Sequence, residues 1–117
     1  MLTEKNYRDF CDEETENELV KLGFPIEHAC LQGIGIYVTI HISLYEAQKW
    51  LREERGILLQ PTYLELSDEW ICVIRDKNKR HGYSTKKQKN YEEVLLEGIK
   101  EAIRISEEKS NVDFLER

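Results

Sequence analysis

The chain has 117 residues, of which 40% are hydrophobic and 34% are charged, and its net charge at pH 7 is −6. This length predicts a single domain over residues 1–117, with its own core and with loosely ordered ends at 1–10 and 107–117. The negative charge argues against a generic nucleic-acid binder. Because no apolar run is long enough to span a membrane and residues 1–10 are too polar for a signal peptide, we expect a cytoplasmic protein.

A short first helix is predicted to begin after Asp12, because three glutamates follow within its first turn, where they suit the helix dipole. Gly23 and Phe24 predict a Schellman ending, and Pro25 prevents the helix from continuing. Most of this helix is expected to be exposed. The next stretch, residues 26–35, shows no helix or strand pattern, only glycines that indicate a turn.

Residues 36–42 alternate between apolar and polar side chains, which predicts a half-buried strand. This strand leads directly into Ser43. Together with Glu46, Ser43 forms a capping box, so we expect an amphipathic helix to start there. Gly56 can adopt the left-handed conformation that ends a helix, and it predicts the end of this one.

Two apolar runs, residues 57–66 and 70–74, predict a β-hairpin after that helix. Pro61 cannot donate to a ladder, so the first strand is expected at an edge or with a bulge. Both faces of the second run are largely apolar, which is typical of a central strand. Tyr83 and Ser84 are candidates for a brief third strand.

The last helix is expected to begin near Asn90, where Asn90 and Glu93 repeat the capping pattern. Gly98 lies on its apolar stripe and costs about 1 kcal/mol relative to alanine, which indicates a close approach of the helix to the sheet. Phe114 and Leu115, in the charged tail, pack back on the domain or contact a partner.

These elements predict an α+β fold: a small antiparallel sheet with two amphipathic helices packed on one face, and a short N-terminal helix. The strand at residues 36–42 pairs either within that sheet or with a second chain. An exposed edge at that strand would favour a homodimer.

The chain carries no nucleophile elbow, phosphate loop, dinucleotide fingerprint or zincin helix. Cys11, Cys30 and Cys72 lack paired spacing, which indicates free thiols in a reducing compartment. The spacing of these cysteines from His28 and His41 is not that of a structural zinc site. We therefore predict no catalytic residue, no metal and no cofactor, and lean against an enzyme.

The most informative charge feature is residues 77–89, which contain six basic residues and no acidic one, so that the rest of the chain carries −12. The basic residues are Lys77, Lys79, Arg80, Lys86, Lys87 and Lys89. The segment precedes the last helix, and helix N–H groups together with lysines make a site for anions such as backbone phosphates. The alternative is a solvated loop that balances an acidic protein.

From Ser43 onwards, the order helix, strand, strand, third strand, helix resembles double-stranded RNA-binding domains. Residues 82–90 followed by an apolar helix are similar to the basic stretch that opens the final helix of that family. The resemblance implies that Lys86, Lys87 and Lys89 contact phosphates across a major groove and that the helix at Ser43 meets the minor groove. The loop between the first two strands is shorter than in that family and lacks its proline and histidine.

The chain also resembles a group of short uncharacterised proteins of Bacteroides-type bacteria and their phages. Residues 12–24, 47–56 and 91–102 carry this resemblance, which implies kinship of fold and no mechanism. We therefore predict a non-catalytic binding or accessory module, derived from a phage or mobile element, whose partner is a second copy or another protein. The alternative is nucleic-acid binding through residues 77–89.

Overall fold

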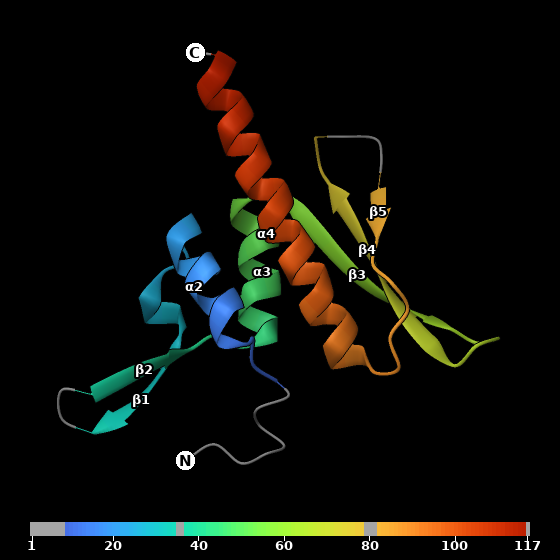
Figure 1. Cartoon of the computed structure of the whole chain (residues 1–117), viewed down its shortest axis with the longest axis horizontal. Helices are drawn as coiled ribbons and strands as arrows, with labels where there is room; N and C mark the ends of the chain where they lie inside the picture. The colour runs from blue at the N-terminus through green and yellow to red at the C-terminus, as the bar shows by residue number, and fades with distance from the viewer. Residues whose placement is uncertain (1–8, 35–36, 79–81, 117) are drawn as a thin grey trace.

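The computed structural model describes residues 9–34, 37–78 and 82–116. Its elements in chain order are α2 (Glu13–Leu22), η1 (Ile26–His28), β1 (Cys30–Ile34), β2 (Tyr37–His41), α3 (Leu44–Glu54), β3 (Ile57–Leu64), β4 (Glu69–Asp76), β5 (Gly82–Ser84) and α4 (Tyr91–Glu116) (Figure 1). The strands form two antiparallel sheets, β1-β2 and β3-β4-β5. The predicted α+β fold is confirmed.

The three-stranded sheet carries α3 and α4 on one face, as predicted. Its central strand is β4, whose Cys72 and Ile74 are fully buried beneath the helices. Strand β3 is an edge strand, and Pro61 lies in it, opposite Cys72. The side-chain amide of Gln48 in α3 donates a hydrogen bond to the Leu59 carbonyl of this edge strand at 3.0 Å. The edge is therefore partly covered by a helix as well as interrupted by proline.

Helix α4 lies close to the sheet because position 98 has no side chain. A Cβ atom at Gly98 would lie 2.5 Å from Sγ of Cys72 and 3.1 Å from its Cβ. Contacts that short do not occur between real side chains, so only glycine fits there. The close approach that the sequence indicated is confirmed.

The three helix starts are capped as predicted. Side-chain oxygens of Asp12, Ser43 and Asn90 each accept a hydrogen bond from the backbone N–H three residues later, at 2.8, 3.1 and 2.8 Å. Gly23, with a φ of 110°, closes the Schellman ending of α2, and Gly56, with a φ of 68°, follows the end of α3. These local signals fix where each helix begins or ends.

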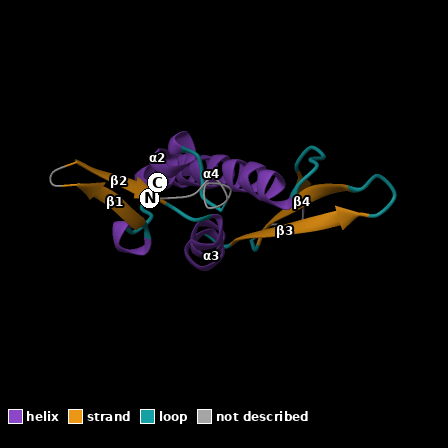
Figure 2. Ribbon diagram, turned by 90° about the horizontal axis from the view of Figure 1, so that it is seen from below, coloured by secondary structure: helices purple, strands orange, loops and turns teal. Residues whose placement is uncertain are grey.

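The sequence showed no helix or strand pattern in residues 26–35, but the structure has a short helix and a strand there. They contain η1 and the strand β1, which pairs with β2 so that Cys30 lies opposite His41. The strand predicted at residues 36–42 therefore pairs with β1, and the expectation that it joins the sheet of β3, β4 and β5 is wrong. Figure 2 shows the resulting arrangement, with the two sheets at opposite ends of the molecule and the helices between them.

Helix α4 continues to Glu116, so its backbone extends through most of the predicted loose end at 107–117. The side chains of Phe114 and Leu115 lie outside the described part of the chain, as do residues 1–8. Among the residues that the structure describes, no helix combines the length and apolar character needed to cross a bilayer.

Candidate functional site

The predicted basic stretch is spread along one edge of the three-stranded sheet rather than gathered at one point. Lys79 and Arg80 lie outside the described residues. Lys77 follows the end of β4, where its N–H donates to the Gly56 carbonyl at 2.9 Å. Lys86 and Lys87 lie beyond β5, towards the other end of the sheet.

We call residues 86–89 the lysine segment; it consists of Lys86, Lys87, Gln88 and Lys89. All three of its lysines are exposed. In the described part of the chain, none of them forms an ion pair. Their ammonium groups are therefore available to an anionic ligand.

Backbone pairing to β4 holds the lysine segment in place. Trp70 and Gln88 exchange two hydrogen bonds, with N···O distances of 2.8 and 2.9 Å. Two residues further along β4, the Cys72 carbonyl accepts from the Thr85 N–H at 3.0 Å, and the Cys72 N–H donates to Oγ1 of Thr85 at 3.0 Å. The chain advances three residues from Thr85 to Gln88, while the paired strand β4 advances only two, from Cys72 to Trp70. This difference of one residue is the geometry of a β-bulge. Lys86 and Lys87 form this bulge.

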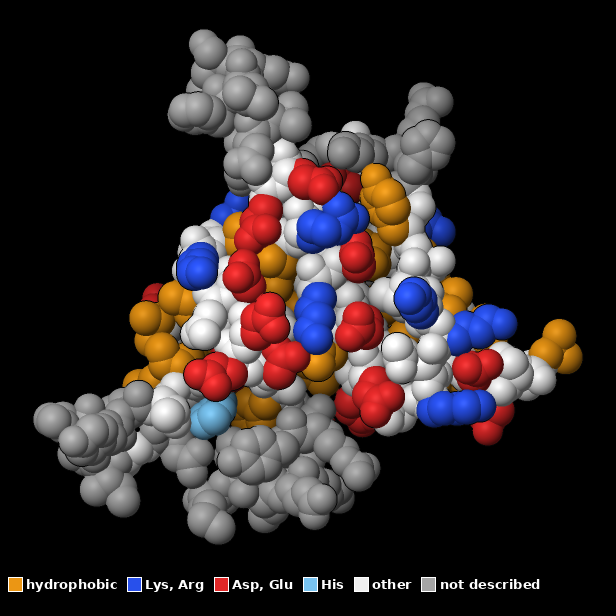
Figure 3. Space-filling view, viewed as in Figure 1, with side chains coloured by type: hydrophobic (Ala, Val, Ile, Leu, Met, Phe, Trp, Pro, Cys, Tyr) orange, Lys and Arg blue, Asp and Glu red, His pale blue; other side chains and the backbone are white. Residues whose placement is uncertain are grey.

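Two basic residues of α4 form ion pairs, unlike the lysines of the lysine segment. Lys100 forms an ion pair with Asp12 at 3.1 Å, and Arg104 pairs with Glu101 at 2.8 Å and with Glu108 at 2.6 Å. Figure 3 shows acidic side chains prevailing over α2 and α4, whereas basic and acidic side chains both lie on the side of the three-stranded sheet. Lys100 and Arg104 are therefore neutralised by neighbouring carboxylates, whereas, among the described residues, the lysines of the lysine segment are not.

A row of three aromatic side chains adjoins the lysine segment. This aromatic row consists of Tyr63, Trp70 and Tyr91, with ring centroids 5.2 Å apart for Tyr63–Trp70 and 5.3 Å apart for Trp70–Tyr91. Trp70 is half-buried, whereas Tyr63 and Tyr91 are 44% and 41% exposed. The Tyr63 hydroxyl donates to Asp68 at 2.6 Å, and this hydrogen bond raises the pKa of Tyr63.

The sequence did not predict the aromatic row. The hairpin register places Tyr63 opposite Trp70, because the turn is centred between Leu66 and Ser67, earlier than the polar residues 67–69 that separate the two predicted apolar runs. The contact with Tyr91 depends on the angle at which α4 crosses the sheet, and no sequence pattern states that angle.

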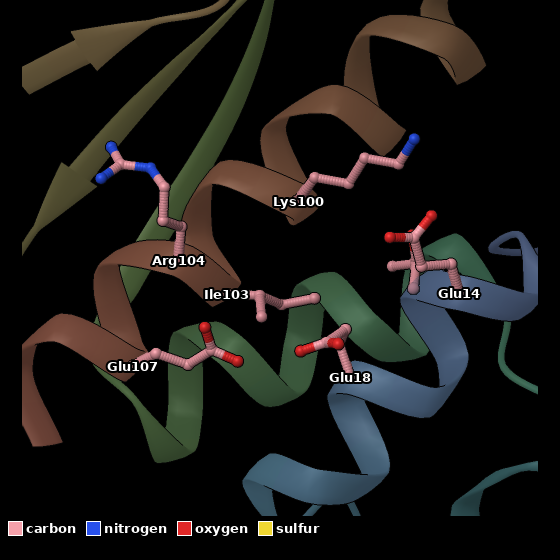
Figure 4. Close-up of a pocket in the computed structure, with 7 residues that line it drawn as sticks. Glu14, Glu18, Lys100, Ile103, Arg104 and Glu107 are labelled. Carbon is pink, nitrogen blue, oxygen red and sulfur yellow. The ribbon is translucent and has the colours of Figure 1, made fainter.

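A hollow of about 300 Å³ lies between α2 and α4 (Figure 4). Its lining residues are Glu14, Thr15, Glu18, Lys100, Ile103, Arg104 and Glu107. Burial and the facing carboxylate of Glu18 raise the pKa of Glu107. In Figure 4, Lys100 and Arg104 extend away from the facing Glu18 and Glu107 side chains. The lining is mostly charged, and we interpret the hollow as the surface groove where the two helices meet.

The buried thiols are unsuited to nucleophilic chemistry. Burial raises the pKa of Cys11 to about 12 and that of Cys72 to about 11. Both are therefore protonated at neutral pH, whereas the thiolate is the reactive form. Cys30 is exposed and free.

The histidines also lie in structural surroundings. The ring of His28 packs edge-on against Phe24 with centroids 6.5 Å apart, and Nδ1 of His41 lies 3.8 Å from the Glu16 carboxylate. Within residues 9–34, 37–78 and 82–116, no group of three or more histidine, cysteine or acidic side chains is placed to hold a metal ion.

No family model, curated protein or solved structure matches the chain. The two resemblances seen in the sequence therefore stay predictions.

Proposed function

We propose that the protein is a non-catalytic binding module whose ligand is a nucleic acid, held by Lys86, Lys87 and Lys89. One observation carries the proposal. These exposed lysines, free of ion pairs in the described structure, sit on a backbone-anchored bulge just before the capped start of α4. Phosphate groups are the anions that such a row of ammonium groups suits best.

The arrangement of the neighbouring elements supports this ligand class. The order α3, β3, β4, β5, α4, with both helices on one face of the sheet, is the one that the resemblance to double-stranded RNA-binding domains implies. In that resemblance the lysines before the last helix contact phosphates. Glu92 and Glu93 occupy the first turn of α4 and offset its dipole, so the lysines supply the attraction rather than the helix end.

The burial of two cysteines and the surface position of the α4 carboxylates support a non-catalytic role. Cys11 and Cys72 are buried with raised pKa values, and the carboxylates of α4 lie beside basic side chains on the helix surface. We also propose a cytoplasmic location, because the exposed thiol of Cys30 suits a reducing compartment.

The test is binding of labelled RNA and DNA, single-stranded and duplex, at salt concentrations of about 50 and 200 mM. We expect binding that weakens steeply with salt. The double variant Lys86→Glu, Lys87→Glu should lose at least about tenfold in affinity and reduce the salt slope by about 2, because each phosphate contact contributes nearly one unit.

The matched control is Lys21→Glu, Lys100→Glu, which changes the net charge equally but lies on the helices α2 and α4. It should retain most of the affinity. Equal losses in the two double variants would show that net charge, rather than the lysine segment, governs binding. Absence of binding at low salt would refute the proposal.

A second proposal, self-association, rests on the β1-β2 hairpin. In the described structure both outer edges of this two-stranded sheet lack a strand partner, and Leu31 is 61% exposed. An uncovered edge is a template for strand addition. Light scattering after size exclusion should detect a dimer, and Leu31→Lys should favour the monomer. A monomer at high protein concentration would rule this proposal out.

A further inference from the structure

We infer that the lysine segment and the aromatic row form one site, which binds unpaired nucleotides of a single strand in preference to a duplex. This inference rests on the proposed function and specifies its ligand. The lysines would bind phosphates and the rings would stack on bases. Both contacts are independent of sequence, since every nucleotide has a phosphate and a π-face.

The two groups are joined through Trp70. Its backbone exchanges two hydrogen bonds with Gln88, which lies between Lys87 and Lys89 in the chain. Tyr91 follows Lys89 by two residues and packs against the Trp70 ring at right angles, with an interplanar angle of 87°. The backbone of the lysine segment and the aromatic row are therefore held next to one another by the pairing with β4 and by the start of α4.

The exposure of the rings favours a ligand. A purely structural aromatic cluster would close the end of the core and leave little ring surface in water. Here the two outer rings, Tyr63 and Tyr91, keep 44% and 41% of their surface exposed, while only Trp70 between them is half-buried. Such rings can accept a base on their outer surfaces. A duplex offers no base faces except at its ends, so an aromatic site discriminates against it.

The turn between β3 and β4 argues against a duplex as well. Double-stranded RNA-binding domains span two successive minor grooves, and the turn between their first two strands is longer than the one in this chain. In this chain the turn carries Glu65 and Asp68, Glu69 follows at the start of β4, and Leu66 at the tip is 106% exposed. These carboxylates repel phosphates, so cationic contact is confined to the lysine segment. A flexible single strand can follow one short basic segment, whereas a rigid duplex gains little from it.

The acidic residues at the two ends of the aromatic row also determine where the phosphates can lie. Asp68 accepts the hydrogen bond from Tyr63 at one end, and Glu92 follows Tyr91 at the other. We therefore place the phosphates along Lys86, Lys87 and Lys89, with bases directed towards the rings.

The experiment measures affinity for three probes of about 12 nucleotides: a single strand of adenosines, a duplex, and a strand of abasic nucleotides. We expect the adenosine strand to bind more tightly than both other probes. Tyr91→Ala and Tyr63→Ala should each weaken adenosine-strand binding about 5- to 100-fold, as loss of one stacked base predicts, and leave the salt slope unchanged.

Two controls separate stacking from folding. Tyr45→Ala removes a tyrosine that is 63% exposed on α3, away from the row, and should leave the affinity unchanged. Tyr91→Phe keeps the ring and should retain binding. Circular dichroism melting of each variant establishes that it is folded.

The outcomes distinguish the two proposals. If the lysine variants weaken binding while the abasic strand binds as tightly as the adenosine strand, the nucleic-acid proposal stands and the stacking inference is wrong. Duplex binding equal to or tighter than single-strand binding also overturns the inference. If no probe binds at low salt, both fail.

Discussion

The unit formed by α3, β3, β4, β5 and α4 and the N-terminal unit of α2, β1 and β2 are held in different ways. In the first unit, side chains such as Leu51, Ile74 and Ile99 are fully buried between helices and sheet. In the second, Leu19 is equally buried, but Leu31 of the hairpin is 61% exposed. The buried side chains of both units form one core cluster, to which the N-terminal unit contributes Leu19 of α2, whereas Leu31 of its hairpin stays outside the cluster.

Hydrogen bonds join the start of the N-terminal unit to the junction between β2 and α3. The carboxylate of Glu16 accepts a 2.6 Å hydrogen bond from the Ile42 N–H, and the Ile42 carbonyl accepts one from the Cys11 N–H at 2.9 Å. An exposed ion pair between Asp12 and Lys100 adds little, because water screens it. We therefore expect substitutions of the same kind to change the stability of the protein by different amounts in the two units.

The largest expected effect is from Leu51→Ala. Leu51 is fully buried in the first unit, so its truncation should lower the free energy of unfolding by about 2–5 kcal/mol. Leu66→Ala, at a residue that is 106% exposed, is the control and should change it by less than about 0.5 kcal/mol. Urea denaturation measures both.

Leu19→Ala sharpens the comparison, because Leu19 is as buried as Leu51 but belongs to α2. We expect a smaller loss than for Leu51→Ala, since a docked helix can shift to fill the space. An equal or larger loss would show that the N-terminal unit is an integral part of the core.

Gly98→Ala should have the next largest effect. The added methyl group would meet Sγ of Cys72 at 2.5 Å, and overpacking of this kind costs about 1–3 kcal/mol, more than the helix propensity of alanine returns. In a double-mutant cycle, Cys72→Ala should reduce this cost because it removes the sulfur. A stabilised Gly98→Ala protein would contradict the close approach of α4.

The first unit was also the one that the sequence predicted well. The caps at Ser43 and Asn90, the edge position of Pro61 and the close approach at Gly98 each follow from a local rule about one residue type. Strand β1 was missed because its sequence contains a glycine and shows no alternation of apolar and polar residues. It forms a strand because it pairs with β2.

The sequence predicted only part of the candidate site, because only the lysines form a pattern that is local in the chain. The charge run pointed to Lys86, Lys87 and Lys89 without any knowledge of the fold. The aromatic row beside them joins β3, β4 and α4, so it depends on long-range packing that a single sequence does not encode locally. Trp70, which links both groups through Gln88, was predicted only as a strand residue.

Loss of a cap should have a smaller effect that tells the two units apart. Asp12→Ala and Ser43→Ala each remove an N-cap and should each cost about 1 kcal/mol. We expect Asp12→Ala to speed amide hydrogen exchange mainly in α2, and Ser43→Ala to speed it throughout α3 and the sheet. Uniform exchange changes in both variants would indicate one cooperative unit.

The smallest expected effect concerns the pH dependence of the docking. Burial raises the pKa of Glu16 above its usual value of 4.5, so the folded state binds its proton more tightly than the unfolded state. The stabilisation is complete below that value and is lost as the pH rises through the folded pKa. Glu16→Gln retains an oxygen to accept from Ile42 and does not ionise. Its stability relative to the wild type should therefore increase between about pH 4 and pH 7, by less than about 1.4 kcal/mol. Thermal melts across this range measure the difference; a constant difference would mean that the carboxylate is as well stabilised in the fold as in water.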